Sequence, residues 1–243
     1  MKTLINYSPN FELKKRKPEQ IKFIVLHYTG MTKEINAINR LTSFKSKVSS
    51  HYFIKKNGQI LTLVPDLYIS WHAGISCWKS YKSLNKYSIG IEVSNSGHDF
   101  KYQEYTKKQL RSVLKLCKFL IKKYKIKSKN ILGHSDISPN RKKDPGEKFP
   151  WYYFSKQKIG IWHDLNKKKL LKERNKKISI LEKRLFSKNL YKIGYPKNLT
   201  KKKNSYIKKL TLAFQRRFRQ ELINGIIDKE CLIISKNLVK KFK

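Results

Sequence analysis

Cysteine is scarce in this chain, with only Cys77, Cys117 and Cys231 among 243 residues. The three are odd in number, far apart and without Cys-x-x-Cys spacing, which argues against a disulfide framework and against a zinc site built from cysteines. Cys117 falls on the apolar face of an expected helix, where a small buried hydrophobic residue is the simplest interpretation. A fold of this composition must depend on its hydrophobic core, and 39% of the residues are hydrophobic.

Long apolar runs are also missing. No stretch approaches the roughly 20 residues that a helix needs to span a bilayer. The first residues, MKTLINYSPNFELKKRK, contain no uninterrupted apolar segment of the kind that marks a signal peptide. We therefore expect a cytoplasmic protein, with the periplasm or cell envelope as the alternative location.

Acidic residues are few. Asp and Glu total 16 against 57 Lys and Arg, a formal net charge of +41. Such an excess creates a positive surface potential that attracts polyanions, among them nucleic acid, anionic lipid and an anionic cell wall. The charge is spread along the whole chain, mostly as lysine, so a general lysine bias explains it at least as well as a dedicated nucleic-acid patch. We expect non-specific attraction to anionic polymers and no specific nucleic-acid partner.

The first 165 residues or so mix strand and helix patterns. The β-branched and aromatic content predicts strands at 21–28, 51–64, 87–93 and 130–136. The second of these reads as a hairpin around Asn57-Gly58, a type I′ turn signal. Gly90 in the third permits a close backbone approach. We expect an α/β fold with a mixed central β-sheet flanked by helices.

Two helices are expected in this part. Thr32 is placed to cap a helix whose apolar face includes Ile35, Ile38 and Leu41. Thr106 and Gln109 form a capping box before a long amphipathic helix that ends near Tyr124. The segment 141–151 contains two prolines and a glycine and cannot be regular structure.

After Trp162 the composition changes. We divide the chain into a domain at 1–165, a charged linker at 166–175, and a small all-α domain of three short helices at 176–243. Phe214, Phe218 and Leu222 recur at helical spacing and are expected in the core of the second domain.

Two of the six histidines stand out by context. His27 and His134 each follow a buried-strand pattern and precede a polar loop, where a rigid scaffold holds functional side chains. Asp144 lies ten positions after His134 in a loop broken by Pro145 and Gly146. Two imidazoles and a carboxylate leave a fourth position open on Zn²⁺, as catalytic zinc sites require. Spacing alone does not identify the reaction.

Five motifs then occur in order: FIVLHYTGM, SSHYFIKKNGQI, WHAGISCW, LNKYSIGIEVSN and GHSDISPNRKKDPGEKFPW. Over about residues 5–163 the chain resembles the zinc-dependent N-acetylmuramoyl-L-alanine amidases of the amidase-2 family, which are related to the peptidoglycan recognition proteins. Within that family it looks most like the bacterial muropeptide amidases. The resemblance implies one zinc ion held by His27, His134 and Asp144, and hydrolysis of the amide between N-acetylmuramic acid, or its 1,6-anhydro form, and L-alanine.

The resemblance also implies roles for further residues. Glu92 and Lys142 would be catalytic, Glu92 moving a proton and Lys142 stabilising the oxyanion. A glutamate in an otherwise apolar strand is costly to bury without a role, whereas only the motif distinguishes Lys142 from its basic neighbours. The matching positions near the substrate groove are Trp71, His72 and Asn85, with core packing an equally good reading of Trp71. His51 is expected to be structural, and Asp136 to bond locally or orient a neighbour.

The C-terminal part resembles the three-helix peptidoglycan-binding domain found beside such amidases. LYKIGYP is similar to its first helix and turn, and AFQRRFRQELINGIID to its central helix and the turn after it. The Lys-rich segment 197–203 departs from the family pattern. The expected partners are therefore peptidoglycan or muropeptide fragments.

Three alternatives stay open at this point. His134 and Asp136 have the His-x-Asp spacing of an iron site with two histidines and one carboxylate, for which His163 would be the third ligand. A non-catalytic peptidoglycan-binding protein would use the same scaffold without turnover. A phage-type endolysin would use the same chemistry on intact cell wall, and the sequence does not choose between muropeptide recycling, remodelling and lysis.

Overall fold

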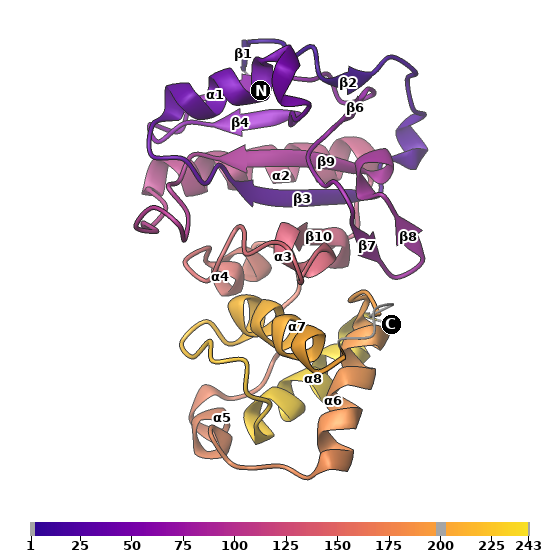
Figure 1. The fold of residues 1–243 in the computed structure, drawn as a ribbon, viewed down its shortest axis with the longest axis vertical. Helices are drawn as coiled ribbons and strands as arrows, with labels where there is room; N and C mark the ends of the chain where they lie inside the picture. Colours follow the sequence, from indigo (N-terminus) through magenta and orange to yellow (C-terminus); the bar gives the residue numbers. More distant parts are fainter. Residues whose placement is uncertain (1–2, 198–202, 243) are drawn as a thin grey trace.

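The computed structural model of the protein describes residues 3–197 and 203–242. Figure 1 shows a sheet-containing part at one end of the long axis and a group of helices at the other, with the C-terminus on the helical group. Most of the Lys-rich segment 197–203 lies outside the described residues. Within the part that is described, no helix has the length and hydrophobicity that a membrane span requires.

Six strands form the main sheet, in the order β1-β5-β4-β9-β3-β10. All neighbouring pairs are parallel except β4 and β5, which are antiparallel. Two small two-stranded sheets lie beside it. The strands of the main sheet are β1 (Leu4–Ile5), β3 (Phe23–Tyr28), β4 (Tyr52–Ile54), β5 (Ile60–Thr62), β9 (Ser88–Val93) and β10 (Ile131–Gly133), and those of the small sheets are β2 (Phe11–Glu12) with β6 (Ile69–Ser70) and β7 (Cys77–Trp78) with β8 (Tyr81–Lys82).

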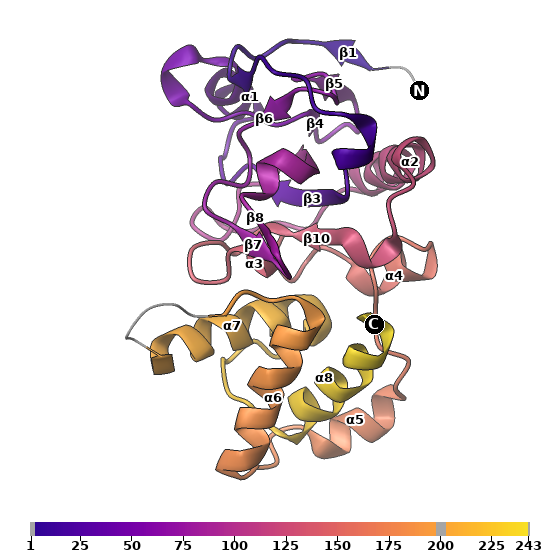
Figure 2. The ribbon, with the colours of Figure 1, turned by 90° about the vertical axis from the view of Figure 1, so that its right-hand side faces the viewer.

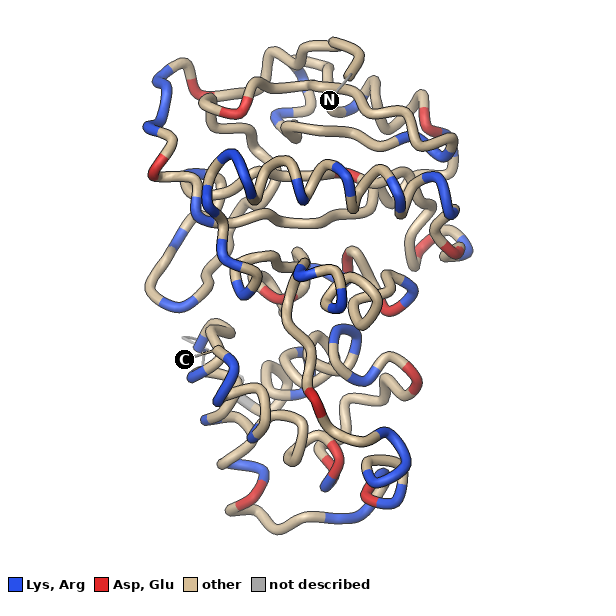
Figure 3. Tube along the Cα trace, turned by 180° about the vertical axis from the view of Figure 1, so that it is seen from behind, with Lys and Arg blue, Asp and Glu red and all other residues tan. Residues whose placement is uncertain are grey.

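The two faces of the main sheet pack against different elements, because side chains alternate between the faces along each strand. On one face, Ile24 and Leu26 of β3 join a buried cluster with Val113 and Leu120 of α2 (Lys107–Tyr124). Figure 3, seen from behind, shows α2 crossing this face with lysine and arginine along its outer side. The other face therefore carries the remaining side chains of β3, which include His27.

Two hydrophobic clusters cover the second face of the sheet, which carries His27. Toward β4 and β5, a small cluster joins Phe53 and Leu61 to α1 (Glu34–Thr42). Toward β3 and β10, Phe23 and Val25 belong to a cluster that continues into the C-terminal helices. Figure 2 shows this region below the sheet, with α3 (His134–Ile137) and α4 (Trp151–Lys156) between the two parts. The sheet and the C-terminal helices thus share one core.

In the C-terminal region, the described residues form four helices. They are α5 (Lys167–Glu173), α6 (Ile180–Ile193), α7 (Lys203–Phe218) and α8 (Lys229–Phe242). The three helices expected after residue 176 are confirmed, and the expected charged linker 166–175 contains α5. Phe214 and Phe218 are buried as expected, but Leu222 lies beyond the end of α7.

The expected fold class, a mixed sheet flanked by helices, is confirmed. The capping box is also confirmed, since the Gln109 backbone N–H donates to the Thr106 hydroxyl. The irregular segment ends where α4 begins at Trp151. These features depend on local rules that the sequence displays directly.

Two local predictions are wrong. The helix α1 begins at Glu34 with Lys33 as its N-cap, so Thr32 is one residue too early for its hydroxyl to reach the free N–H groups. Its buried face consists of Ala37, Ile38 and Leu41, whereas Ile35 is 57% exposed. The hairpin forms, but only Gly58 of its turn has a positive φ, so the turn is not type I′, which needs a positive φ at two residues.

Candidate metal centre

Three parallel strands bring the candidate site together. His27 and Glu92 are paired near the carboxyl ends of β3 and β9. His134 follows β10 directly, as the first residue of α3. Because β3, β9 and β10 are parallel, their carboxyl ends meet at one edge of the sheet. The loop that follows α3 returns to this edge and carries Asp144.

The donor atoms of His27, His134 and Asp144 form a compact triangle. The two Nδ1 atoms are 2.9 Å apart, and each lies 3.0 Å from Oδ2 of Asp144. All three side chains are buried. No other group of three His, Cys, Asp or Glu residues in the described part of the chain could hold a metal ion in this way.

The donor set fits a divalent metal. Two imidazole nitrogens and one carboxylate oxygen are the ligands of hydrolytic zinc sites, and zinc takes such atoms at about 2.0–2.2 Å. Burial, followed by the neighbouring His134, lowers the pKa of His27 to about 4, so its ring is neutral near pH 7. Burial opposes ionisation of Asp144, but His134 and His27 together hold the pKa of this carboxyl well below its usual range. A neutral imidazole and an ionised carboxylate are the protonation states that metal binding requires.

A chain of hydrogen bonds sets the tautomer of His27. The Ser88 hydroxyl donates to the Leu84 carbonyl at 2.6 Å, so its oxygen accepts from Nε2 of His72 at 3.1 Å. His72 then accepts at Nδ1 from Nε2 of His27, at 3.0 Å. The lone pair on Nδ1 of His27 is therefore left free to face the other two donors. Outer hydrogen bonds of this kind orient metal ligands in proteins.

His134 is oriented in a simpler way. Its Nε2 atom lies 3.1 Å from the carbonyl oxygen of Ala73, which only accepts, so Nε2 carries the hydrogen and Nδ1 is free. Arg141 donates to the same carbonyl at 3.0 Å. The loop with the sequence WHAG thus orients both histidine ligands. The ring of His72 holds His27, and the backbone carbonyl of Ala73 holds His134.

Glu92 stands beside the triangle in an apolar strand. It is partly buried, and its Oε2 atom is unexposed and has no hydrogen-bond partner among the described residues. Burial, followed by the charge of Asp144, raises the pKa of Glu92 well above its ordinary value, while the Lys142 ammonium acts in the opposite direction. A carboxyl in this position is suited to accepting and returning a proton.

A pocket of about 330 Å³ opens onto this centre. Trp71 lines its wall and is half-buried, which favours the groove reading over core packing. Lys142 and Glu92 line it together with His134 and Asp144, and His72 reaches it as well. Six of the eight sequence-predicted site residues therefore line one cavity, and a seventh, His27, lies behind them with its Nδ1 atom at His134 and Asp144.

Asn85 is the exception. Its Oδ1 atom accepts the backbone N–H groups of His72 at 3.1 Å and Ala73 at 2.7 Å, and it does not line the pocket. The proposed substrate contact is corrected to a positioning role, because an amide oxygen that binds two adjacent N–H groups shapes the loop that carries His72. His51 is structural as expected and accepts from the Gly90 backbone N–H through Nδ1.

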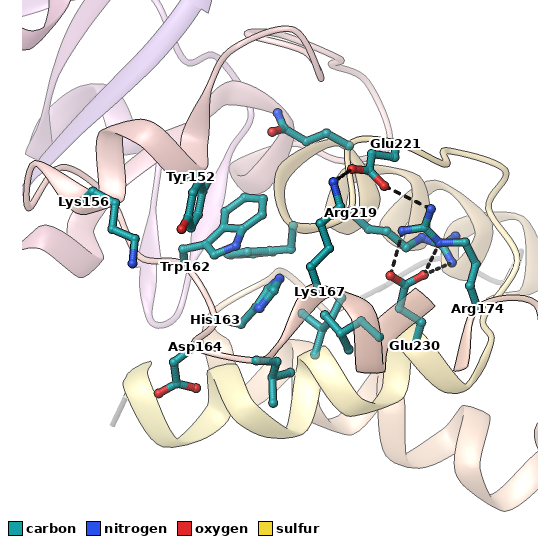
Figure 4. A pocket seen from close by; sticks show the side chains of 15 residues that line it. Tyr152, Lys156, Trp162, His163, Asp164, Lys167, Arg174, Arg219, Glu221 and Glu230 are labelled. Carbon is teal, nitrogen blue, oxygen red and sulfur yellow. Dashed lines mark hydrogen bonds and ion pairs between the residues drawn. The ribbon is translucent and has the colours of Figure 1, made fainter. Parts of the chain in front are cut away.

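The alternative iron site is contradicted. The carboxylate of Asp136 is bound by Arg217 and Tyr195 and takes no part in the triangle. His163 lines a different cavity of about 500 Å³, with Trp162 and Arg174 (Figure 4). The His-x-Asp spacing fails because α3 starts at His134, and successive residues of a helix point in different directions.

Sequence reasoning missed several residues near the site. Ser88 completes the bond chain behind His27, and Arg40 adds an exposed cation to the pocket wall. Tyr28 lines the pocket too, and its hydroxyl bonds to His98 at 2.8 Å, which in turn contacts Glu147 at 3.0 Å. Ser88 lies within the motif LNKYSIGIEVSN and Tyr28 lies next to His27, so both carried a usable signal, whereas no local motif marks Arg40.

Comparison with known proteins agrees with this geometry. The family model described as N-acetylmuramoyl-L-alanine amidase, Amidase_2, matches residues 17–147. N-acetylmuramoyl-L-alanine amidase AmiD of Escherichia coli is 33% identical over 237 residues, or 92% of this chain and 84% of that protein. The 1,6-anhydro-N-acetylmuramyl-L-alanine amidase AmpD of Haemophilus influenzae is 33% identical over 162 residues, or 59% of this chain and 85% of that protein.

Two solved structures are similar over nearly the whole chain. One is E. coli AmiD in complex with the substrate anhydro-N-acetylmuramic acid-L-Ala-D-γ-Glu-L-Lys, with a TM-score of 0.81, 33% identity, and coverage of 91% of this chain and 90% of that one. The other is AmpDh3 of Pseudomonas aeruginosa in complex with anhydromuramic pentapeptide, with a TM-score of 0.81, 28% identity, and coverage of 96% and 97%. Both include the C-terminal helices in the match.

Proposed function

The chain belongs to the Amidase_2 family of N-acetylmuramoyl-L-alanine amidases, and on this premise we propose that it uses zinc to hydrolyse anhydro-muropeptides. It cleaves the amide between the lactyl group of N-acetylmuramic acid and the L-alanine of the stem peptide. The observation that carries the zinc proposal is the buried triangle of His27, His134 and Asp144. No ion is part of the structure, and the donor set alone supports the choice of metal.

The 1,6-anhydro form of the substrate is proposed from two relatives. The solved structures of AmiD and AmpDh3 hold anhydromuramic peptides, and they match 91% and 96% of this chain. An anhydro-muropeptide substrate supports a role in peptidoglycan recycling. The cytoplasmic location and glycan binding by the C-terminal region remain predictions from the sequence.

We infer that the residues of the pocket have separate roles in the reaction. When bound, zinc supplies a Lewis acid that polarises the amide carbonyl and lowers the pKa of water toward about 7. Glu92 takes a proton from the attacking water and returns it to the departing alanine nitrogen, a task that its raised pKa favours. Glu92 lines the same pocket as His134 and Asp144, which supports this role.

Lys142 faces the charge that develops on the amide oxygen. It is half-buried in the pocket wall, and its ammonium acts on the pKa values of both His27 and Glu92, so it lies within electrostatic reach of both. A fixed cation in such a position stabilises an oxyanion by roughly 3–4 kcal/mol in comparable sites. Trp71 supplies the apolar wall on which the substrate lies.

The proposal is tested by digestion of two substrates with the purified protein. Anhydro-muropeptides and intact sacculi are incubated side by side with and without Zn²⁺, and the products are assigned by mass spectrometry. We expect release of a free stem peptide from anhydro-muropeptides, lost after chelation and restored by zinc. No release with zinc present would refute the amidase assignment and favour a binding protein, whereas faster release from sacculi would overturn the recycling role.

A further inference from the structure

The carboxylate of Asp136 is held from the C-terminal region. Arg217 of α7 forms a buried ion pair with its Oδ2 atom. The hydroxyl of Tyr195, which follows α6, donates to Oδ1 at 2.8 Å. The Gly133 backbone N–H donates to Oδ2 at 2.7 Å. Three donors thus converge on one carboxylate, two of them from the C-terminal region far along the chain.

All of these groups are excluded from water. Asp136 is 1% exposed, Arg217 2% and Tyr195 2%. The Arg217 guanidinium also lies 4.1 Å from the ring centroid of Trp151 and donates to the Ile131 carbonyl at 2.8 Å. An arginine with this many fixed contacts occupies one position relative to β10, the strand that delivers His134.

Asp136 is linked to the proposed metal ligands through the helix α3. It lies in α3, the four-residue helix whose first residue is His134. The next residue, Ser135, donates its backbone N–H to the Asp144 carbonyl at 2.9 Å. The position of α3 therefore sets the backbone of two of the three proposed ligands.

A second contact holds the loop that carries Asp144. The Gln220 side-chain amide, just after α7, donates to the carbonyls of Glu147 at 2.5 Å and Phe149 at 2.7 Å. The same end of α7 thus reaches both α3 and the loop after Asp144. These contacts of Arg217, Tyr195 and Gln220 all join residues of the chain itself, so none of them requires a bound glycan.

We propose that the C-terminal helical region is part of the metal centre's support, with Arg217, Tyr195 and Gln220 as positioning residues. Arg217 and Tyr195 act through Asp136 and α3, and Gln220 acts on the Asp144 loop. The inference rests on the proposed metal site. It gives the helices a role in catalysis that is independent of cell-wall binding.

The expected effect follows from the buried charges. Removal of the Arg217 guanidinium leaves the Asp136 carboxylate buried without its counter-ion, so α3 must shift or admit water. Loss of such outer contacts typically lowers metal affinity by about 10- to 100-fold. Tyr195→Phe removes a single hydrogen bond and keeps the packing, so its effect is smaller and the fold is retained.

The experiment measures Zn²⁺ affinity by competition with a chromophoric chelator, using the full chain and its Arg217→Met and Tyr195→Phe variants. The matched control is Arg219→Met. Arg219 is 3% exposed and paired with Asp228 and Glu230, and these contacts stay within the C-terminal region. Figure 4 shows Arg219 and Glu230 at the second cavity, together with Arg174. The absorption spectrum of the Co²⁺-loaded proteins reports ligand geometry independently of activity.

We expect Arg217→Met to weaken Zn²⁺ binding by about 10- to 100-fold and to alter the Co²⁺ spectrum, with Tyr195→Phe intermediate. Arg219→Met should lower thermal stability and leave both metal readouts as in the wild type. Unchanged Zn²⁺ affinity and Co²⁺ spectrum in Arg217→Met and Tyr195→Phe would overturn the inference, as would equal losses in Arg219→Met. Failure of the wild type itself to bind zinc would instead refute the proposed function.

Discussion

The ring of His72 lies directly against the backbone of Gly90. A β-carbon at Gly90 would stand 2.4 Å from Cγ of His72, well inside van der Waals contact. Gly90 has no positive φ, so the requirement is for space and not for an unusual backbone conformation. The glycine in the central strand β9 thus admits the ring that orients His27.

Gly90→Ala should displace His72. Overpacking of this kind typically costs about 1–3 kcal/mol, and here it also breaks the bond to His27. We expect a lower free energy of unfolding in urea and weaker zinc binding. In the double variant with His72→Ala the two losses should be less than additive, because the clash no longer exists. Additive losses would show that the clash is not the cause.

Ser88→Ala should weaken metal binding without unfolding the protein. The change leaves Nε2 of His72 without its acceptor, so His72 no longer holds one tautomer of His27. We expect zinc affinity to fall by about tenfold or more. Ser70→Ala is the matched control, since the Ser70 hydroxyl bonds to Nδ1 of His51 at 2.7 Å in the same core. An equal fall in zinc affinity in Ser70→Ala would show that the loss comes from disturbed packing of the core and not from the tautomer of His27.

Glu92→Gln should abolish turnover and stabilise the metal-free protein. The folded-state pKa of Glu92 is raised, so its contribution to stability is present below about pH 4.5 and is lost as the pH rises through the folded-state value. The variant should therefore melt at a higher temperature than the wild type at pH 8 after chelation, and the difference should vanish toward pH 4. A variant that melts at a lower temperature than the wild type at pH 8 would show that the pKa of Glu92 is not raised in the folded protein.

The same shift predicts the acidic limb of the pH–rate profile. A base must be ionised to act, so kcat/KM of the wild type should rise with a midpoint above 4.5, the ordinary value for a glutamate. The measurement is hydrolysis of an anhydro-muropeptide from pH 4 to pH 9. An acidic limb with the same midpoint in the residual activity of Glu92→Gln would exclude Glu92 as the group whose ionisation controls the rate.

Lys142→Met should lower kcat with little change in KM. The ammonium acts on charge that develops during the reaction, so its loss costs about 100- to 1,000-fold in rate. Lys143→Met is the matched control for charge, because Lys143 also lines the pocket but is exposed, with a long 3.4 Å contact to Asp99. A large rise in KM for Lys142→Met would indicate that the lysine binds the ground state.

Much of the fold and of the site was open to prediction because it depends on local signals. The strands that hold His27 and Glu92, the capping box at Thr106 and the irregular Asp144 loop all carry such signals within a few residues. The type I′ turn failed because Asn57-Gly58 is compatible with more than one hairpin turn. Turn type depends on the register of the flanking strands as well as on the dipeptide.

The outer contacts of the site were not open to prediction in the same way. Asp136 and Arg217 are 81 residues apart, and His27 and His72 are 45 apart. No spacing rule joins residues at such distances, and only the packing of α7 against α3 brings the first pair together. Asn85 was misplaced for the same reason, since a motif shows that a residue matters without showing whether it faces substrate or backbone.

The core that the sheet shares with the C-terminal helices predicts that the molecule unfolds as one cooperative unit. Its buried residues run from Phe23 and Val25 in β3 through Trp78 to Leu238 and Phe242 in α8. A ligand that binds only the folded state slows every opening that requires the loss of that state. Occupancy of the site at His27 should therefore slow amide hydrogen exchange in α8, a helix that contributes none of the proposed metal ligands.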